Sequence, residues 1–215
     1  LLRRHCALVD RTVREVWRET ALEGAALVAT GGYGRGELYP GSDVDLLVLL
    51  PEGITEAGKE KVEKLIGTLW DIGLEIGHSV RTVQGCVESA AEDITIRTTL
   101  MEARYLAGSR RLFSDLLKAL EETNDPLSFF KAKKLEQEQR HAKHQDTPYS
   151  LEPNLKEAPG GLRDLHTIMW IARASGIGRR WSDLVSAGLL ERHEARQLAR
   201  HEAAFQDLRI RLHYL

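Results

Sequence analysis

Apolar and polar residues alternate along the first part of the chain in patterns that predict helices and strands in turn. Apolar positions recur at helical spacing between residues 2 and 23 and predict an amphipathic helix. Continuous apolar runs at residues 25–30 and 44–50 predict two buried strands. A helix over residues 54–70 and a third strand over residues 74–82 follow. This order predicts an α+β fold, in which a small mixed sheet is flanked by helices.

The rest of the chain has a helical pattern almost throughout. Helices are expected at residues 94–106, 112–120, 126–144, 163–174, 181–190 and 191–215. We therefore predict two domains, a core at residues 1–86 that includes the first helix and an all-α domain at residues 87–215. The helical pattern is expected to be interrupted at residues 146–148 and at the proline- and glycine-rich residues 151–161. The last predicted helix carries no stop signal, so we expect a segment of a longer chain, truncated at its C-terminal end.

Composition limits the classes of partner. The formal net charge is −2 and the pI about 6.5, so there is no global basic field to attract nucleic acid or an anionic membrane. No apolar run approaches the ~20 residues of a bilayer span. Cys6 and Cys86 lack metal-ligand spacing and are expected to be small buried side chains, which fits a reducing, cytoplasmic setting. Any phosphate must therefore be bound locally.

Two aspartates lie where the second predicted strand begins. Asp43 and Asp45 are two residues apart, and because side chains alternate along a strand, both carboxylates should leave the same face, about 6 to 7 Å apart. Two negative charges at this spacing repel each other unless a cation lies between them. Hard oxygen ligands suit Mg²⁺, which retains part of its shell for water and substrate phosphates. The pair therefore predicts metal-assisted phosphoryl or nucleotidyl transfer.

A glycine turn precedes the aspartates. Gly31 and Gly32 connect the first predicted strand to a short helical turn over residues 33–39, and without side chains they allow a phosphate to approach the backbone. Ser42 can add a hydroxyl donor. Taken alone, the glycines would be only a tight turn and Asp43 only a turn residue. Their combination with the acidic pair, between two strands, favours a nucleotide site.

This combination resembles the signature of the nucleotidyltransferase superfamily, in which a GG or GS turn is followed by an acidic pair on the next strand. The resemblance implies a nucleotidyltransferase-type sheet, with Asp43 and Asp45 as catalytic Mg²⁺ ligands and Gly31 and Gly32 at the triphosphate. The superfamily usually has a third acid on a later strand. Here Glu75 is the only acid of residues 74–82, and it is either the third ligand or base or a surface glutamate.

Two other polar residues of this third predicted strand have alternative interpretations. His78 is expected to be a structural histidine rather than a ligand. Arg81 is expected either to meet a phosphate or to pair with a nearby carboxylate.

A second glycine pair opens a helix in the all-α part. Arg163 lies in its first turn, after Gly160-Gly161, and a cation at the positive end of a helix suggests an anion nearby. That anion is either a bound phosphate or the adjacent Asp164.

The loop over residues 149–165 and the motif over residues 31–50 resemble bacterial uridylyltransferases that act on the nitrogen-regulatory P-II protein. The resemblance implies transfer of UMP from UTP to a P-II tyrosine with release of diphosphate, and Arg163 joins Gly31, Gly32 and Ser42 as nucleotide-binding residues. Those enzymes are bifunctional, but the metal-binding HD pair that removes UMP is not recognisable here. Adenylyltransferases of glutamine synthetase share the GG-x-RD helix start but carry an aspartate near the position of Ser79. An adenylyltransferase and a nucleotide-binding module without turnover are the alternatives.

Overall fold

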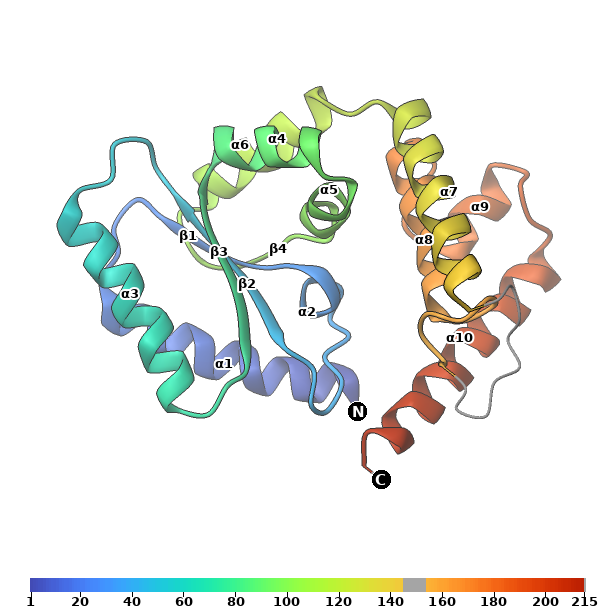
Figure 1. The fold of residues 1–215 in the computed structure, drawn as a ribbon, viewed down its shortest axis with the longest axis horizontal. Helices are drawn as coiled ribbons and strands as arrows, with labels where there is room; N and C mark the ends of the chain where they lie inside the picture. The colour runs from blue at the N-terminus through green and yellow to red at the C-terminus, as the bar shows by residue number, and fades with distance from the viewer. Residues whose placement is uncertain (145–153, 215) are drawn as a thin grey trace. The chain divides into compact units, whose positions relative to one another are not determined.

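The computed structural model describes residues 1–144 and 154–214. These residues form two compact units, Leu1–Thr123 and Asn124–Leu215, each of which is described by itself (Figure 1). The predicted break at residues 146–148 lies outside the described residues, as does the part of the break at 151–161 that precedes residue 154.

The first unit is built on a four-stranded mixed sheet with the order β3-β2-β1-β4. β1 is antiparallel to both of its neighbours, whereas β3 is parallel to β2. The strands are β1 Ala26–Ala29, β2 Val44–Leu50, β3 Ile76–Thr82 and β4 Arg104–Gly108. The mixed sheet confirms the predicted α+β class, and the three strands expected from the apolar runs are present.

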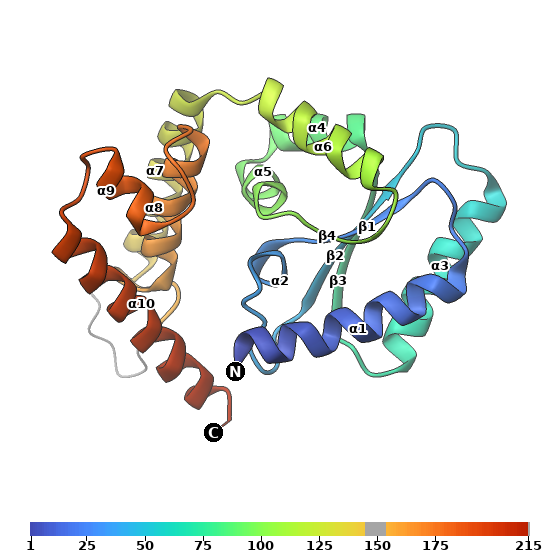
Figure 2. The same ribbon diagram turned by 180° about the vertical axis from the view of Figure 1, so that it is seen from behind.

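Helices cover both faces of this sheet, and Figures 1 and 2 show the two layers from opposite sides. β2 explains the arrangement, because its side chains alternate and both sets are apolar except for Asp45 near the start of the strand. Val44, Leu46 and Val48 share a core with α1 Leu2–Thr20 and α3 Glu56–Asp71. Leu47 and Leu49 share another core with α4 Val83–Glu92, α5 Ile94–Met101 and α6 Arg110–Glu122.

The first unit extends further along the chain than the sequence predicted. The expected boundary at residue 86 lies inside α4, and the unit continues to Thr123. The helix predicted over residues 94–106 is wrong in its second half, because α5 ends at Met101 and β4 follows. β4 pairs with the otherwise open side of β1, with Ala26 opposite Gly108. A strand of five residues is too short for its periodicity to be distinguished from that of a helix end.

The regular elements in the described residues of the second unit are all helices. Its helices are α7 Pro126–Lys143, α8 Leu162–Ala174, α9 Trp181–Ser186 and α10 Arg192–Leu212. α7 begins where predicted because the Asp125 carboxylate caps the N–H groups of Leu127 and Ser128, with Pro126 in the first turn. None of the helices in the described part of the chain has the length and apolar character that a bilayer crossing requires.

Candidate functional site

The glycine turn is a one-turn helix, α2 Gly31–Arg35, between β1 and β2. It starts two residues earlier than the sequence predicted. Gly31 has φ +55°, a left-handed value that glycine tolerates best, and the N–H of Gly34 donates to the Thr30 carbonyl at 2.8 Å. The N–H of Thr30 donates to the carbonyl of Asp45 at 3.0 Å. The turn and the start of β2 therefore meet at one edge of the sheet.

The carboxylate of Asp45 lies between two glycines. A Cβ on Gly31 would lie 2.8 Å from its Oδ2, and a Cβ on Gly77 would lie 2.7 Å from its Oδ1. Gly77 is also the residue of β3 opposite Asp45 in the parallel register. Because real side chains do not tolerate such distances, both positions must lack a Cβ while the carboxylate stays where it is. We call Gly31, Asp45 and Gly77 the carboxylate cradle.

The structure distributes the other predicted residues around this edge. Asp43 lies in the loop one residue before β2 and is exposed, and Ser42 is half-buried, with its N–H donating to the Tyr39 carbonyl at 3.1 Å. Gly32 follows Gly31 in α2, and its missing Cβ would approach the Glu37 carbonyl oxygen at 3.4 Å. Two aspartates at one sheet edge, beside a backbone that is free of side chains, provide a donor set of the kind that Mg²⁺ accepts.

Glu75 lies at the same edge but is not gathered with the aspartates. Its carbonyl accepts the N–H of Val44 at 2.8 Å, and its side chain is exposed. Among the described residues, the ligand oxygens of Asp43, Asp45 and Glu75 do not form a group in which all lie within 4.8 Å of one another. The structure therefore puts Glu75 next to the acidic pair along the sheet edge without completing a three-carboxylate cluster.

His78 and Arg81 of β3 contact protein groups. The ring of His78 lies edge-on to Trp70 of α3, with centroids 5.7 Å apart. Arg81 donates a hydrogen bond to the hydroxyl of Ser89 in α4. His78 therefore packs against an aromatic ring on the exposed side of β3, and Arg81 is bound to a hydroxyl rather than to a carboxylate.

Arg163 belongs to the second unit, at the start of α8. Its guanidinium donates to the carboxylate of Glu157 at 3.0 Å and lies over the ring of Trp170, 5.4 Å from the centroid. Its backbone N–H donates to the carbonyl of Lys156 at 2.9 Å. The loop thus folds back onto the helix start, and the anionic neighbour of Arg163 inside this unit is Glu157 rather than Asp164.

Asp164 instead connects α8 to α7 and to the glycine turn that precedes α8. It accepts hydrogen bonds from Gln137 at 2.8 Å, from the N–H of Gly160 at 2.7 Å, and from Arg140. His141 lies 3.0 Å from it. Burial raises the pKa of this carboxyl, but the hydrogen bonds from Arg140 and Gln137 outweigh burial and hold the pKa below its usual value.

The replacement Asp164→Asn should therefore make the second unit less stable in a pH-dependent way. A carboxyl whose folded pKa is depressed contributes stability above its unfolded value, near 3.8, and loses it as the pH falls through the folded value. We expect the variant to lose about 2 kcal/mol of unfolding free energy at pH 7, measured in urea, and the difference from wild type to shrink below pH 4. Asp207→Asn, which removes an exposed pair with Arg211 on α10, is the control and should change little. A difference that is equal at pH 7 and pH 3 would contradict this account.

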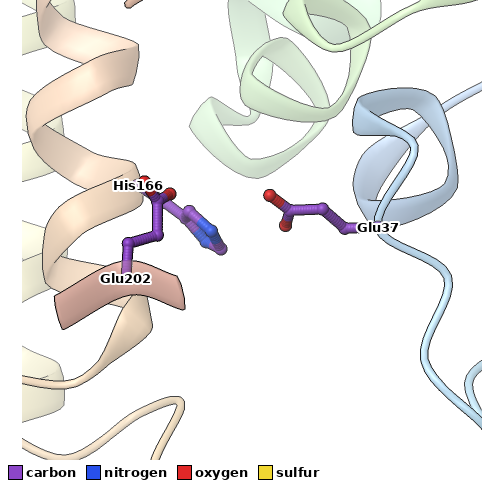
Figure 3. A group of neighbouring side chains, drawn as sticks. All are labelled: Glu37, His166 and Glu202. Atoms are coloured by element: carbon purple, nitrogen blue, oxygen red, sulfur yellow. The ribbon is translucent and has the colours of Figure 1, made fainter. Parts of the chain in front are cut away.

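Two other polar residues of the second unit, one on α8 and one on α10, lie close together. Figure 3 shows His166 of α8 and Glu202 of α10, whose ring nitrogen and carboxylate oxygen lie within 4.8 Å of each other. Glu202 also accepts the indole N–H of Trp181 at 3.0 Å, so it connects α9 to α10. Glu37, drawn in the same figure, belongs to the first unit, where it pairs with Arg35 at 3.0 Å.

Gly77 is the member of the candidate site whose role the sequence did not predict. The motif identified Asp45 and Gly31, whereas nothing in the pattern of residues 74–82 identified Gly77 as part of the site. A glycine inside a strand pattern is a known sign of close backbone or side-chain approach. That sign was present, but the group that approaches Gly77 depends on the register between β2 and β3.

Comparisons with known proteins cover both units. The model of the family described as "Nucleotidyltransferase domain" matches residues 10–105, and that described as "GlnD PII-uridylyltransferase" matches residues 128–215. A solved toxin–antitoxin structure with AMP-PNP matches 64% of this chain and 96% of its own, at 16% identity and a TM-score of 0.32, from which nothing follows for this chain.

Several relatives are named bifunctional uridylyltransferase/uridylyl-removing enzyme. Those of Nitrosospira multiformis and Chromobacterium violaceum are each 53% identical over 100% of this chain. That of Bordetella parapertussis is 55% identical over 97% of it. The chain spans only about a quarter of these relatives, 24–25% of their length. It therefore belongs to the family of the bifunctional uridylyltransferase/uridylyl-removing enzymes, and its residues 10–105 match the nucleotidyltransferase domain.

Proposed function

We propose that the protein transfers UMP from UTP to a tyrosine hydroxyl of the nitrogen-regulatory P-II protein and releases diphosphate. The observation that carries this proposal is the carboxylate cradle, in which two glycines make room for Asp45 next to the glycine turn. Its support is the nucleotidyltransferase match over this part of the chain and the uridylyltransferase relatives over all of it. The uridylyl-removing activity in the relatives' name is assigned to parts of the longer protein outside these residues.

In this proposal Asp43 and Asp45 are the catalytic carboxylates and hold Mg²⁺, with Glu75 as the candidate third acid. The bound cation would neutralise negative charge on the phosphates and the leaving diphosphate. Asp45 is suited to this role because Gly31 and Gly77, which lack a Cβ, leave room for its carboxylate beside the glycine turn.

The nucleotide-binding residues are assigned partly from the glycine turn and partly from the family resemblance. Gly31 and Gly32 offer backbone without side chains, and Ser42 offers a hydroxyl, to the β- and γ-phosphates. Arg163 is assigned to the nucleotide on the basis of the family resemblance, and it would exchange its pair with Glu157 for a phosphate oxygen.

The cytoplasm is the proposed location. Cys6 and Cys86 are both buried free thiols, which is compatible with a reducing compartment. Neither a nucleic acid nor a membrane is part of the proposal.

The function is tested with the full-length protein, Mg²⁺, P-II and UTP labelled at the α-phosphorus. We expect label on P-II, loss of labelling when the acceptor tyrosine is changed to phenylalanine, and competition by unlabelled UTP but weakly by ATP. Preference for ATP would reassign the chain to the adenylyltransferase class. Binding of UTP without release of diphosphate would make it a regulatory module.

A further inference from the structure

One arginine outside the motif holds the end of the glycine turn. The guanidinium of Arg104, the first residue of β4, donates from Nη2 to the carbonyl of Tyr33 at 3.1 Å and from Nε to that of Gly34 at 3.3 Å. These carbonyls belong to the C-terminal half of α2, where the Tyr33 carbonyl also accepts the N–H of Gly36 at 3.1 Å. A cation at this end is also favoured by the helix dipole. Arg104 therefore caps α2 from the neighbouring strand.

Arg104 is itself held by a buried carboxylate. It pairs with both oxygens of Asp10 on α1, at 2.7 and 3.0 Å, and Asp10 is only 8% exposed. Burial raises the pKa of Asp10, but the hydrogen bonds and charge of Arg104 outweigh burial, so the pKa lies below its usual value. Bidentate arginine–carboxylate pairs fix orientation as well as energy. α1, β4 and α2 are thus joined through one planar group.

The segment just before β4 also contacts α2 and limits how far α2 can move relative to the sheet. The buried Glu102, two residues before Arg104, pairs with Arg35 of α2 at 2.6 Å. A Cβ on Gly34 would collide with the carbonyl oxygen of Glu102. α2 therefore rests directly on the backbone that leads into β4.

The other end of α2 is the carboxylate cradle. The backbone of Gly31 lies so close to the Asp45 carboxylate that a Cβ there would come within 2.8 Å of Oδ2, so a displacement of α2 would change the distance between the glycine turn and the carboxylate. We propose that Arg104, oriented by Asp10, is a positioning residue that holds the Gly31-Gly32 turn against Asp45 for nucleotide binding. The catalytic part of this inference rests on the proposed function.

Arg14 provides a matched control. It also pairs with Asp10, at 3.5 Å, and donates to β4 at the Leu106 carbonyl at 3.0 Å. In the described structure, none of its hydrogen bonds or ion pairs reaches α2. Arg104→Met and Arg14→Met each remove one cation from Asp10, but only the first uncaps α2.

The test compares the intact wild-type protein with Arg104→Met, Arg104→Lys and Arg14→Met. We expect KM for UTP to rise about tenfold in Arg104→Met, less in Arg104→Lys, and less than about twofold in Arg14→Met. Amide hydrogen exchange should accelerate at Gly34 and Gly36, whose N–H groups bond to Thr30 and Tyr33, in Arg104→Met, to a smaller extent in Arg104→Lys, and not in Arg14→Met. If Arg104→Met does not fold, the Arg104→Lys variant supports the same comparison.

The two readouts separate this inference from the proposed function. If the wild type does not turn over UTP, the proposed function fails, and the exchange rates at Gly34 and Gly36 still decide whether Arg104 positions α2. Equal KM values and equal exchange rates in Arg104→Met and Arg14→Met would overturn the inference, because Arg104 would then only stabilise the fold.

Discussion

Replacing Asp45 by asparagine is expected to reduce UMP transfer at least about a thousandfold, because a carboxylate that would hold the cation at the reacting phosphates is lost. Asparagine has nearly the same shape, so the space between Gly31 and Gly77 remains filled and the fold should be retained. Asp43→Asn should have a similar effect, and the double variant should have no measurable activity. The measurement is incorporation of labelled UMP into P-II.

The control for this result is Asp71→Asn, at the end of α3 on the exposed surface. It removes the same charge away from the carboxylate cradle and should leave the rate within about twofold of wild type. Retained transfer in the double variant Asp43→Asn/Asp45→Asn would show that the acidic pair is not the catalytic site.

The second large effect is expected from one added methyl group. Gly77→Ala would put a Cβ 2.7 Å from Asp45 Oδ1, and the carboxylate would have to rotate or shift away from its place beside the glycine turn. We expect activity to fall about a hundredfold, as for other displacements of about 1 Å at a reacting centre. Gly77 is not in the left-handed region, so alanine itself suits its backbone. The effect should therefore be on activity far more than on stability.

Gly67→Ala is the matched control for this variant. Gly67 lies in α3, and a Cβ there would meet nothing within 4 Å. The substitution should leave activity unchanged and raise the unfolding free energy by up to about 1 kcal/mol, because alanine favours helix. If Gly77→Ala keeps wild-type kinetics, the position of Asp45 is less constrained than the cradle implies.

Local patterns were sufficient to predict most of the elements around the site. The apolar run of β2 spans the predicted residues, and the glycines and aspartates at its edge identify the candidate site from the sequence alone. Such features are visible in sequence because each depends on neighbouring residues. The domain boundary predicted at residue 86 was wrong because it depends on a distant contact. β4 joins the sheet by pairing with β1, about 80 positions earlier in the chain, and neighbouring residues do not reveal this pairing.

Long-range partners explain the other differences. The ion pair of Arg104 with Asp10 spans 94 positions, and that of Arg35 with Glu102 spans 67. No spacing rule connects residues that far apart. Arg163 was expected to meet either a phosphate or Asp164, and its pair with Glu157 depends on how the loop before α8 folds back.

In the proposed mechanism, the edge of β2 that carries Asp43 and Asp45 binds the metal and the nucleotide. The most direct test is a crystal structure of the protein with Mn²⁺ in place of Mg²⁺ and a non-hydrolysable UTP analogue, with Mn²⁺ located by its anomalous signal. We predict an anomalous peak bound by both Asp43 and Asp45, with the triphosphate against Gly31 and Gly32. A nucleotide bound elsewhere, or a metal that contacts neither aspartate, would contradict the account.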